Sequence, residues 1–109
     1  MEVEQNEISA AGVKFSINDG AKEVARARLY ILHNDLHKEP FGFMEDVFVE
    51  PLYRKRGLGR RILNALIDEA KKRGCYKLIA TSRHERPRVH ELYKSLGFKD
   101  LGLEFRLDF

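Results

Sequence analysis

The sequence predicts an α/β fold in which a mixed β-sheet packs against helices. Three observations predict it. Apolar and polar residues alternate in two runs in the first half of the chain, which is typical of half-buried strands, and a largely apolar run over residues 43–49 follows them. Two later segments have apolar residues at helical spacing, and a short apolar run separates them. The expected order of elements is β-β-β-α-β-α-β.

The composition is that of an ordinary globular domain. The chain has 109 residues, of which 43% are hydrophobic and 34% charged, enough to bury about two-thirds of the unfolded surface. We expect a lead-in over residues 1–11 and one domain over residues 12–109. No basic and apolar leader or membrane-length run is visible, so we expect a cytoplasmic protein. With a single cysteine, Cys75, neither an internal disulfide nor a metal site is expected.

The first three strands are expected to form an antiparallel meander. The first strand has apolar residues at every second position, namely Val13, Phe15 and Ile17. The turn sequence Asn-Asp-Gly at 18–20 separates it from a second alternating run over residues 24–32. A third strand over residues 43–49 follows Pro40.

A crossover helix is expected to begin at Leu58. Lysines in its last turn and Gly74 after it are typical of a helix C-terminus. A strand over residues 76–81 comes next, and a helix crossover places it parallel to strand 43–49. Pro87 begins a second helix that ends near Gly97, and alternation predicts a final strand over residues 103–107.

The segment between the third strand and the first helix is basic and glycine-rich. It reads Arg54-Lys55-Arg56-Gly57-Leu58-Gly59. Glycines let backbone amides turn toward one point, and the helix start adds unpaired amides and a positive dipole end. The pattern predicts a polyphosphate site but matches neither the Walker loop nor the dinucleotide motif. A solvated basic turn is the alternative. No aromatic residues interleave with the cations, so nucleic acid is disfavoured as the partner.

The spacing Arg54-x-x-Gly57-x-Gly59 resembles motif A of the GCN5-related N-acetyltransferases, which move an acetyl group from acetyl-CoA to an amine. Residues 90–98, His-Glu-Leu-Tyr-Lys-Ser-Leu-Gly-Phe, resemble the family's Leu-Tyr-x-x-x-Gly-Phe signature. The resemblance covers residues 12–109 and implies the family's fold without the strand and two helices that normally precede this core. The acceptor side is then expected to be open, or completed by a second subunit in a homodimer.

The resemblance also implies a donor site along the third strand. The strand backbone is expected to pair with the pantetheine arm, and the loop amides are expected to hold the pyrophosphate. The residues implied to bind acetyl-CoA are Val47, Phe48, Val49, Arg54, Lys55, Arg56, Gly57, Leu58, Gly59 and Arg60.

Two residues are predicted to act in catalysis. Glu45, expected to be half-buried on the third strand, is the candidate base for the amine, acting through a water. Its alternative is an ion pair with an arginine of the meander. Tyr93 stands at the family's tyrosine position and is expected to protonate the departing thiolate or to hydrogen-bond to its sulfur, with a core aromatic as its alternative. The amide of Phe48 or Val49 is expected to polarise the thioester carbonyl. His90, three residues before Tyr93, can face the same groove or be structural.

The sequence therefore predicts an N-acetyltransferase that uses acetyl-CoA and acts by direct attack of a primary amine. The acceptor is a small molecule or a protein lysine or N-terminus. The alternative is a non-catalytic regulatory module that binds acyl-CoA, and a nucleic-acid-binding domain is a third hypothesis.

Overall fold

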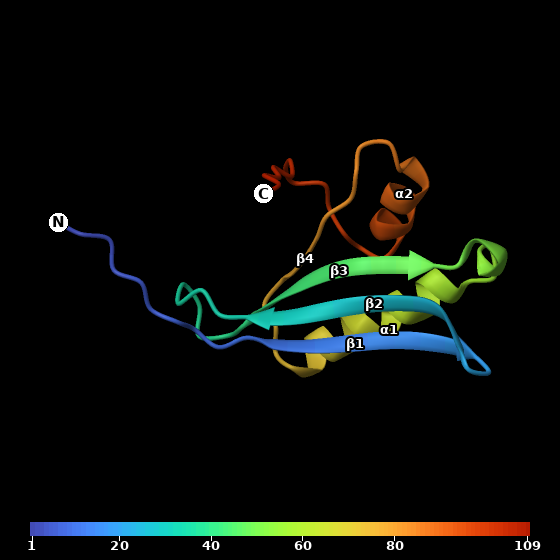
Figure 1. Cartoon of the computed structure of the whole chain (residues 1–109), viewed down its shortest axis with the longest axis horizontal. Coiled ribbons are helices and arrows are strands. Elements are labelled where there is room, and N and C mark those ends of the chain that lie inside the picture. Colours follow the sequence, from blue (N-terminus) through green and yellow to red (C-terminus); the bar gives the residue numbers. More distant parts are fainter. The chain divides into compact units, whose positions relative to one another are not determined.

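The computed structural model describes residues 1–109, which form two compact units, Met1–Ile79 and Ala80–Phe109. Residues 1–10 have no regular structure and are exposed. The elements in chain order are β1 (Ala11–Asp19), β2 (Lys22–Leu32), β3 (Phe41–Val49), the 3₁₀ turn η1 (Pro51–Tyr53), α1 (Leu58–Lys72), β4 (Leu78–Ala80) and α2 (Pro87–Ser95) (Figure 1).

The predicted antiparallel meander is confirmed. β1 pairs with β2 and β2 with β3, both antiparallel, and the sheet order is β1-β2-β3-β4. Gly20 in the hairpin turn has a φ of 59°, a left-handed conformation that glycine adopts without steric cost. The strands are slightly longer than predicted, because β2 begins at Lys22 and β3 at Phe41.

β3 and β4 run parallel, as the crossover helix requires. The amide of Tyr76 donates to the carbonyl of Pro40 and the amide of Gly42 to the carbonyl of Lys77, each at 2.9 Å. Both segments therefore advance in the same direction. β4 has only three residues, whereas a longer strand was predicted over residues 76–81. Because Gly42 bonds to Lys77 and β4 ends three residues later, β4 does not extend along residues 46–49 of β3, which have β2 as their only strand neighbour.

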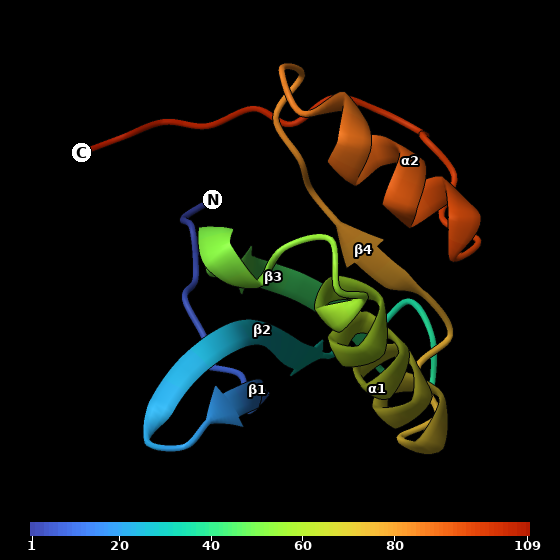
Figure 2. The same ribbon diagram turned by 90° about the vertical axis from the view of Figure 1, so that its right-hand side faces the viewer.

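The core of the first unit lies between α1 and one face of the sheet. α1 crosses this face and contacts β1, β2 and β3 (Figure 2). β2 contributes every second side chain from Ala25 to Ile31, together with Val24, and α1 contributes a stripe at helical spacing. The buried apolar residues are Val24, Ala25, Ala27, Leu29, Ile31, Met44, Ile62, Leu63, Leu66 and Ala70. α1 is thus held along most of its length, which fixes the position of its first turn.

One extra residue in β3 breaks the strand's alternation. The partners on either side of the break are Arg28 with Glu45 and Arg26 with Phe48. Ala27 of β2 therefore lies opposite two residues, Asp46 and Val47, which is a β-bulge. Asp46 has a φ of 54°, in the left-handed region that non-glycine residues rarely adopt.

The bulge changes which side chains of β3 share a face. Directly opposed residues of an antiparallel pair project to the same face. Glu45 and Phe48 therefore lie on the face that carries the two arginines, whereas Val49, opposite Ala25, lies on the α1 face. Simple alternation would have placed Glu45 and Val49 on the same face.

The predicted final strand over residues 103–107 is not formed. Residues 98–109 have no regular structure, and the apolar side chains that alternate there are exposed, namely Leu101, Leu103, Phe105, Leu107 and Phe109. The alternation is present in the sequence, but a strand also requires a neighbour that accepts its hydrogen bonds. This segment has no such neighbour.

We predict that Leu63→Ala lowers the free energy of unfolding by about 2–5 kcal/mol, because Leu63 is fully buried and its removal leaves a cavity. Leu52→Ala is the matched control, since Leu52 is 82% exposed. Urea unfolding of both variants gives the comparison. Equal losses in the two variants would contradict the packing described for α1.

Candidate functional site

The glycine-rich loop lies between the end of β3 and the start of α1. The amide of Glu50 donates to the carbonyl of Val24 at 2.8 Å, which fixes the chain as it leaves β3. Lys55 and Gly57 both have left-handed backbones, with φ of 64° and 77°. Two such residues within three positions turn the chain sharply into α1.

The first turn of α1 is electropositive and uncapped. Gly57 occupies the N-cap position, no side chain caps the helix, and the first turn contains no acidic residue. The positive end of the helix dipole is therefore not neutralised from within the helix. A Cβ built on Gly57 would meet no atom within 4 Å, so the space beside this residue is open. The loop cations Arg54, Lys55, Arg56 and Arg60 are all exposed.

Arg54 connects the loop to the end of β3. Its Nε donates to the carbonyl of Val49 at 2.8 Å, and its guanidinium lies 5.7 Å from the ring centre of Phe48. Arg26 lies against the same ring at 4.7 Å. Phe48 is thus contacted by two guanidinium groups. The carbonyl of Val49 already has a donor, which limits how far a bound strand-like ligand can pair along β3.

Tyr53 ties the loop to the β1–β2 turn. Its hydroxyl donates to Asp19 Oδ2 at 2.5 Å, and this hydrogen bond raises the pKa of the phenol. Arg56 and Lys22 lie 5.0 Å and 5.9 Å from the centre of its ring. The contact was not predicted from the sequence, because it joins residues 34 positions apart and no local pattern marks it.

Asp46 is the charged centre of the bulge. Arg26 donates to its carboxylate through Nε at 2.8 Å and through Nη2 at 3.2 Å, and Arg28 donates to Oδ2. These partners, Arg26 first, lower the pKa of Asp46, and the same hydrogen bond raises the pKa of Arg26. Asp46 is not among the site residues predicted from the sequence. The pattern Arg26-x-Arg28, which puts two cations on one strand face, was the available signal.

Glu45 differs from its expected environment. It is exposed rather than half-buried, and its carboxylate has no hydrogen-bond or ion-pair partner. Asp46, not Glu45, forms the ion pairs with the meander arginines. The bulge accounts for both differences, because it brings Asp46 within reach of the arginines and leaves Glu45 facing solvent. Whether Glu45 acts as a base stays a prediction.

Tyr93 belongs to the second unit and to the C-terminal motif of α2. The amide of Phe98 donates to the carbonyl of Tyr93 and that of Gly97 to the carbonyl of Lys94, each at 3.0 Å. Gly97 has a φ of 102°, and the rings of Tyr93 and Phe98 lie 5.5 Å apart. These contacts form a Schellman motif, so Gly97 and Phe98 orient the Tyr93 ring. Burial raises the pKa of the Tyr93 hydroxyl, which has no hydrogen-bond partner in the protein.

His90 has a structural partner in the same unit. Its Nε2 lies 2.8 Å from the carbonyl oxygen of Arg83, which joins α2 to the segment before it. The arginines near this segment, Arg83, Arg86 and Arg88, are exposed. This hydrogen bond agrees with the structural interpretation of His90.

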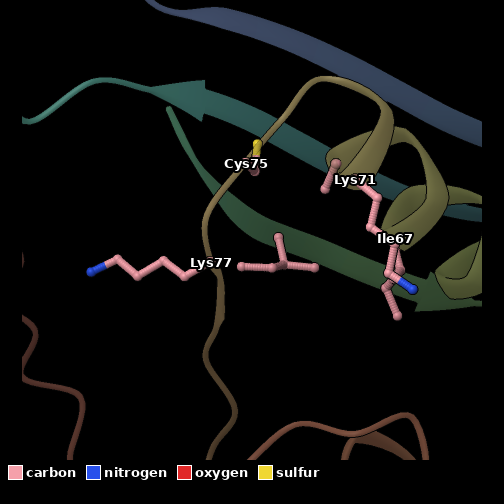
Figure 3. A pocket seen from close by; sticks show the side chains of 6 residues that line it. Ile67, Lys71, Cys75 and Lys77 are labelled. Atoms are coloured by element: carbon pink, nitrogen blue, oxygen red, sulfur yellow. The ribbon is translucent and has the colours of Figure 1, made fainter. Parts of the chain in front are cut away.

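A separate apolar hollow of about 180 Å³ lies at the other end of α1. Ile67, Ala70 and Leu78 line it together with Cys75 and the stems of two lysines. Figure 3 shows the Lys77 side chain extending away from α1. Burial raises the pKa of the Cys75 thiol, so the thiol remains protonated. The hollow shares no residue with the glycine loop.

The chain contains no cluster of three or more His, Cys, Asp or Glu side chains that could hold a metal ion. Neither helix is long and apolar enough to cross a membrane.

Comparison with known proteins identifies the fold family. Residues 3–98 match the model of the acetyltransferase (GNAT) family. Glucosamine 6-phosphate N-acetyltransferase of Trypanosoma brucei brucei is 37% identical over 67 residues, covering 62% of this chain and 44% of the relative. The [ribosomal protein bS18]-alanine N-acetyltransferase of Escherichia coli K12 is 42% identical over 55 residues, covering 50% of this chain and 37% of the relative. The chain thus spans less than half the length of either relative.

A solved structure agrees over a longer stretch. The crystal structure of glucosamine-6-phosphate N-acetyltransferase from Arabidopsis thaliana superimposes with a TM-score of 0.81 at 26% identity, covering 90% of this chain and 67% of that one. The family match includes the basic loop, the bulged strand β3 and the Tyr93 motif. The chain therefore belongs to the acetyltransferase (GNAT) family.

Proposed function

We propose that this protein transfers an acetyl group from acetyl-CoA to a primary amine. One observation carries the proposal most directly. A chain of the acetyltransferase family presents an exposed basic loop that leads into an uncapped, unneutralised helix N-terminus at the end of a bulged strand. Such a terminus favours a phosphate-bearing ligand.

The donor is proposed to bind along β3 and the loop. Residues 46–49 lack a strand neighbour on one edge, and the segment Val47, Phe48 and Val49 is proposed to pair with the pantetheine arm through the backbone groups that point to that edge, apart from the Val49 carbonyl, which Arg54 occupies. The amides at residues 54–59 are proposed to hold the pyrophosphate, with charge supplied by Arg54, Lys55, Arg56 and Arg60. The bond from Arg54 to the Val49 carbonyl supports a pantetheine path along β3 that ends at the loop.

The chemistry is proposed to be direct attack of the amine on the thioester. The amine nitrogen forms a bond to the carbonyl carbon, and the carbon–sulfur bond then breaks. Glu45 is the proposed base, acting through a water, and its unpaired exposed carboxylate supports that role. Tyr93 is the proposed donor of the proton that the leaving thiolate accepts, and its unpartnered hydroxyl supports that role. An amide of Phe48 or Val49 is proposed to stabilise the oxyanion.

The acceptor is proposed to be a primary amine on a small molecule or at a protein N-terminus or lysine. The trypanosome relative is named for an amino-sugar phosphate and the bacterial relative for a protein alanine. Both acceptors present a primary amine to the thioester, which is the feature that the proposed mechanism requires.

Titration of the purified chain with acetyl-CoA, followed by a thiol-release assay over amino sugars, other amines and basic peptides, tests the proposal. We expect binding and acceptor-dependent thiol release. Binding without release across the panel would favour the regulatory acyl-CoA-binding module. The absence of binding would overturn the proposed function.

We predict that Gly57→Val weakens acetyl-CoA binding by roughly 10–100-fold, the loss of one or two hydrogen bonds to charged phosphate. A Cβ there occupies the open space beside the loop amides. Gly74→Val is the matched control. Gly74 has a φ of 76°, against 77° for Gly57, and a Cβ added to it would likewise meet no atom within 4 Å. Both variants carry similar backbone strain. Calorimetric titration of both separates that strain from loss of the site, and equal affinities would contradict the assignment.

We predict that Tyr93→Phe lowers kcat for acetyl transfer by about 100-fold or more, the contribution typical of a general acid. The ring contact with Phe98 is retained, so acetyl-CoA affinity and the unfolding midpoint should stay close to wild type. Steady-state kinetics with calorimetry measures the two effects. Unchanged turnover would remove the hydroxyl from the mechanism.

We predict that Glu45→Gln lowers kcat by about 100-fold while acetyl-CoA affinity is preserved. Because the side chain is exposed and unpaired, stability should be unaffected. Glu50→Gln, a half-buried neighbour at the end of the strand, is the control for loss of one negative charge. A full rate with Glu45→Gln would show that another group accepts the amine proton.

A further inference from the structure

We propose that Asp46, held by Arg26 and Arg28, is a positioning residue that fixes the β3 bulge and so aims the backbone of residues 47–49 at the acyl-CoA donor. This inference rests on the proposed function. It adds three side chains, all outside the glycine loop, to the machinery that shapes the donor site.

The backbone at Asp46 requires something to hold it. A φ of 54° is unfavourable for a residue with a Cβ, and aspartate is one of the few that tolerate it. A bulge without a specific contact can slip along its strand, because neighbouring positions accept the extra residue at similar cost. Here the Asp46 side chain at the bulge accepts hydrogen bonds from two arginines of the neighbouring strand β2.

The two arginines bracket the bulge from the opposite strand. Arg26 lies opposite Phe48 and Arg28 opposite Glu45, the residues on either side of Asp46 and Val47. Both guanidinium groups converge on one carboxylate, Arg26 through two nitrogens and Arg28 through one. A slip of one residue would take the Asp46 carboxylate away from this pair, so the contact selects the register.

The contact belongs to a charged network across three strands. Lys14 of β1 pairs with Glu23 at 2.5 Å, and Glu23 lies 3.9 Å from Arg26. Each charged side chain in this network has a neighbour of opposite sign, in the order Lys14, Glu23, Arg26, Asp46 and Arg28. Networks hold geometry better than isolated exposed pairs do.

Arg26 links the bulge to the proposed oxyanion donor. Besides holding Asp46, its guanidinium lies 4.7 Å from the ring centre of Phe48. Arg54 contacts the same ring and the carbonyl of Val49. The segment 46–49 is therefore held at both ends, by Asp46 at the bulge and by Arg54 at the loop. A ligand that pairs with this segment needs its amides and carbonyls in one fixed direction.

The test compares Asp46→Gly and Asp46→Asn with wild type. Glycine accepts the left-handed backbone at no steric cost but removes both ion pairs. Asparagine tolerates this backbone and keeps a neutral acceptor for the arginines. We expect acetyl-CoA affinity to fall by about tenfold or more in Asp46→Gly and by less in Asp46→Asn. The amide chemical shifts of residues 47–49 should change in Asp46→Gly without ligand.

Glu69→Gln is the matched control. It removes another ion pair of the first unit, the 2.7 Å contact between Glu69 and Arg73 on α1, and should leave acetyl-CoA affinity within about twofold of wild type. Thermal unfolding of all three variants checks that the fold is kept. A purely structural role for Asp46 would lower the unfolding midpoint and leave affinity unchanged.

The outcomes separate this inference from the proposed function. If wild type binds acetyl-CoA and Asp46→Gly binds it equally well, the inference is overturned and the function stands. If wild type does not bind, the function is overturned and the inference with it. Weaker binding by Asp46→Gly, with an unfolding midpoint close to that of Glu69→Gln, supports the inference.

Discussion

The packing of α1 against β2 is the interaction on which the rest of the first unit depends. β2 is the central strand of the meander, and its side chains Ala27 and Leu29 are fully buried beneath the apolar stripe of α1. The stripe continues from Ile62 to Ala70, so the helix is held over more than two turns. Its first turn then stands at a fixed place beside the end of β3. The basic loop joins two anchored points.

The electrostatics of that loop work against stability. Four exposed cations lie close to a helix N-terminus that has no capping side chain and no acidic residue in its first turn. Like charges and the positive end of the dipole disfavour this arrangement in the free protein. A bound anion would reduce both the repulsion between the cations and the unfavourable interaction with the helix dipole. The Tyr53–Asp19 and Arg54–Val49 hydrogen bonds fix the conformation of this loop in the free protein. Less conformational entropy is therefore lost when an anion binds to it.

Much of the fold could be predicted from local patterns. The turn at Gly20, the stop at Gly74 and the cap at Gly97 are positions where the backbone has a positive φ, and glycine marks them in the sequence. The meander, the crossover helix and the loop follow from periodicity and from these stops. The motif at Tyr93 also has a local cause, because its Gly-Phe ending encodes a Schellman motif.

The bulge could not be predicted in the same way. A single left-handed residue at Asp46 arises from contacts with another strand, and no glycine marks the position. Strict alternation would put Glu45 on the same face as Val49, and the arginine partner considered as the alternative for Glu45 belongs to Asp46 instead. The prediction of a final strand was wrong for the opposite reason. Its alternation is clear, but pairing is a property of two segments, and periodicity describes only one of them.

The unpaired segment after α2 has a practical consequence for handling the protein. Large apolar side chains at every second position, exposed on an extended chain, are a template for intermolecular cross-β association. Glu104, Arg106 and Asp108 alternate with them and act as gatekeepers against such stacking. Conditions that screen or neutralise these charges, such as high salt or acid, should therefore favour aggregation through this segment.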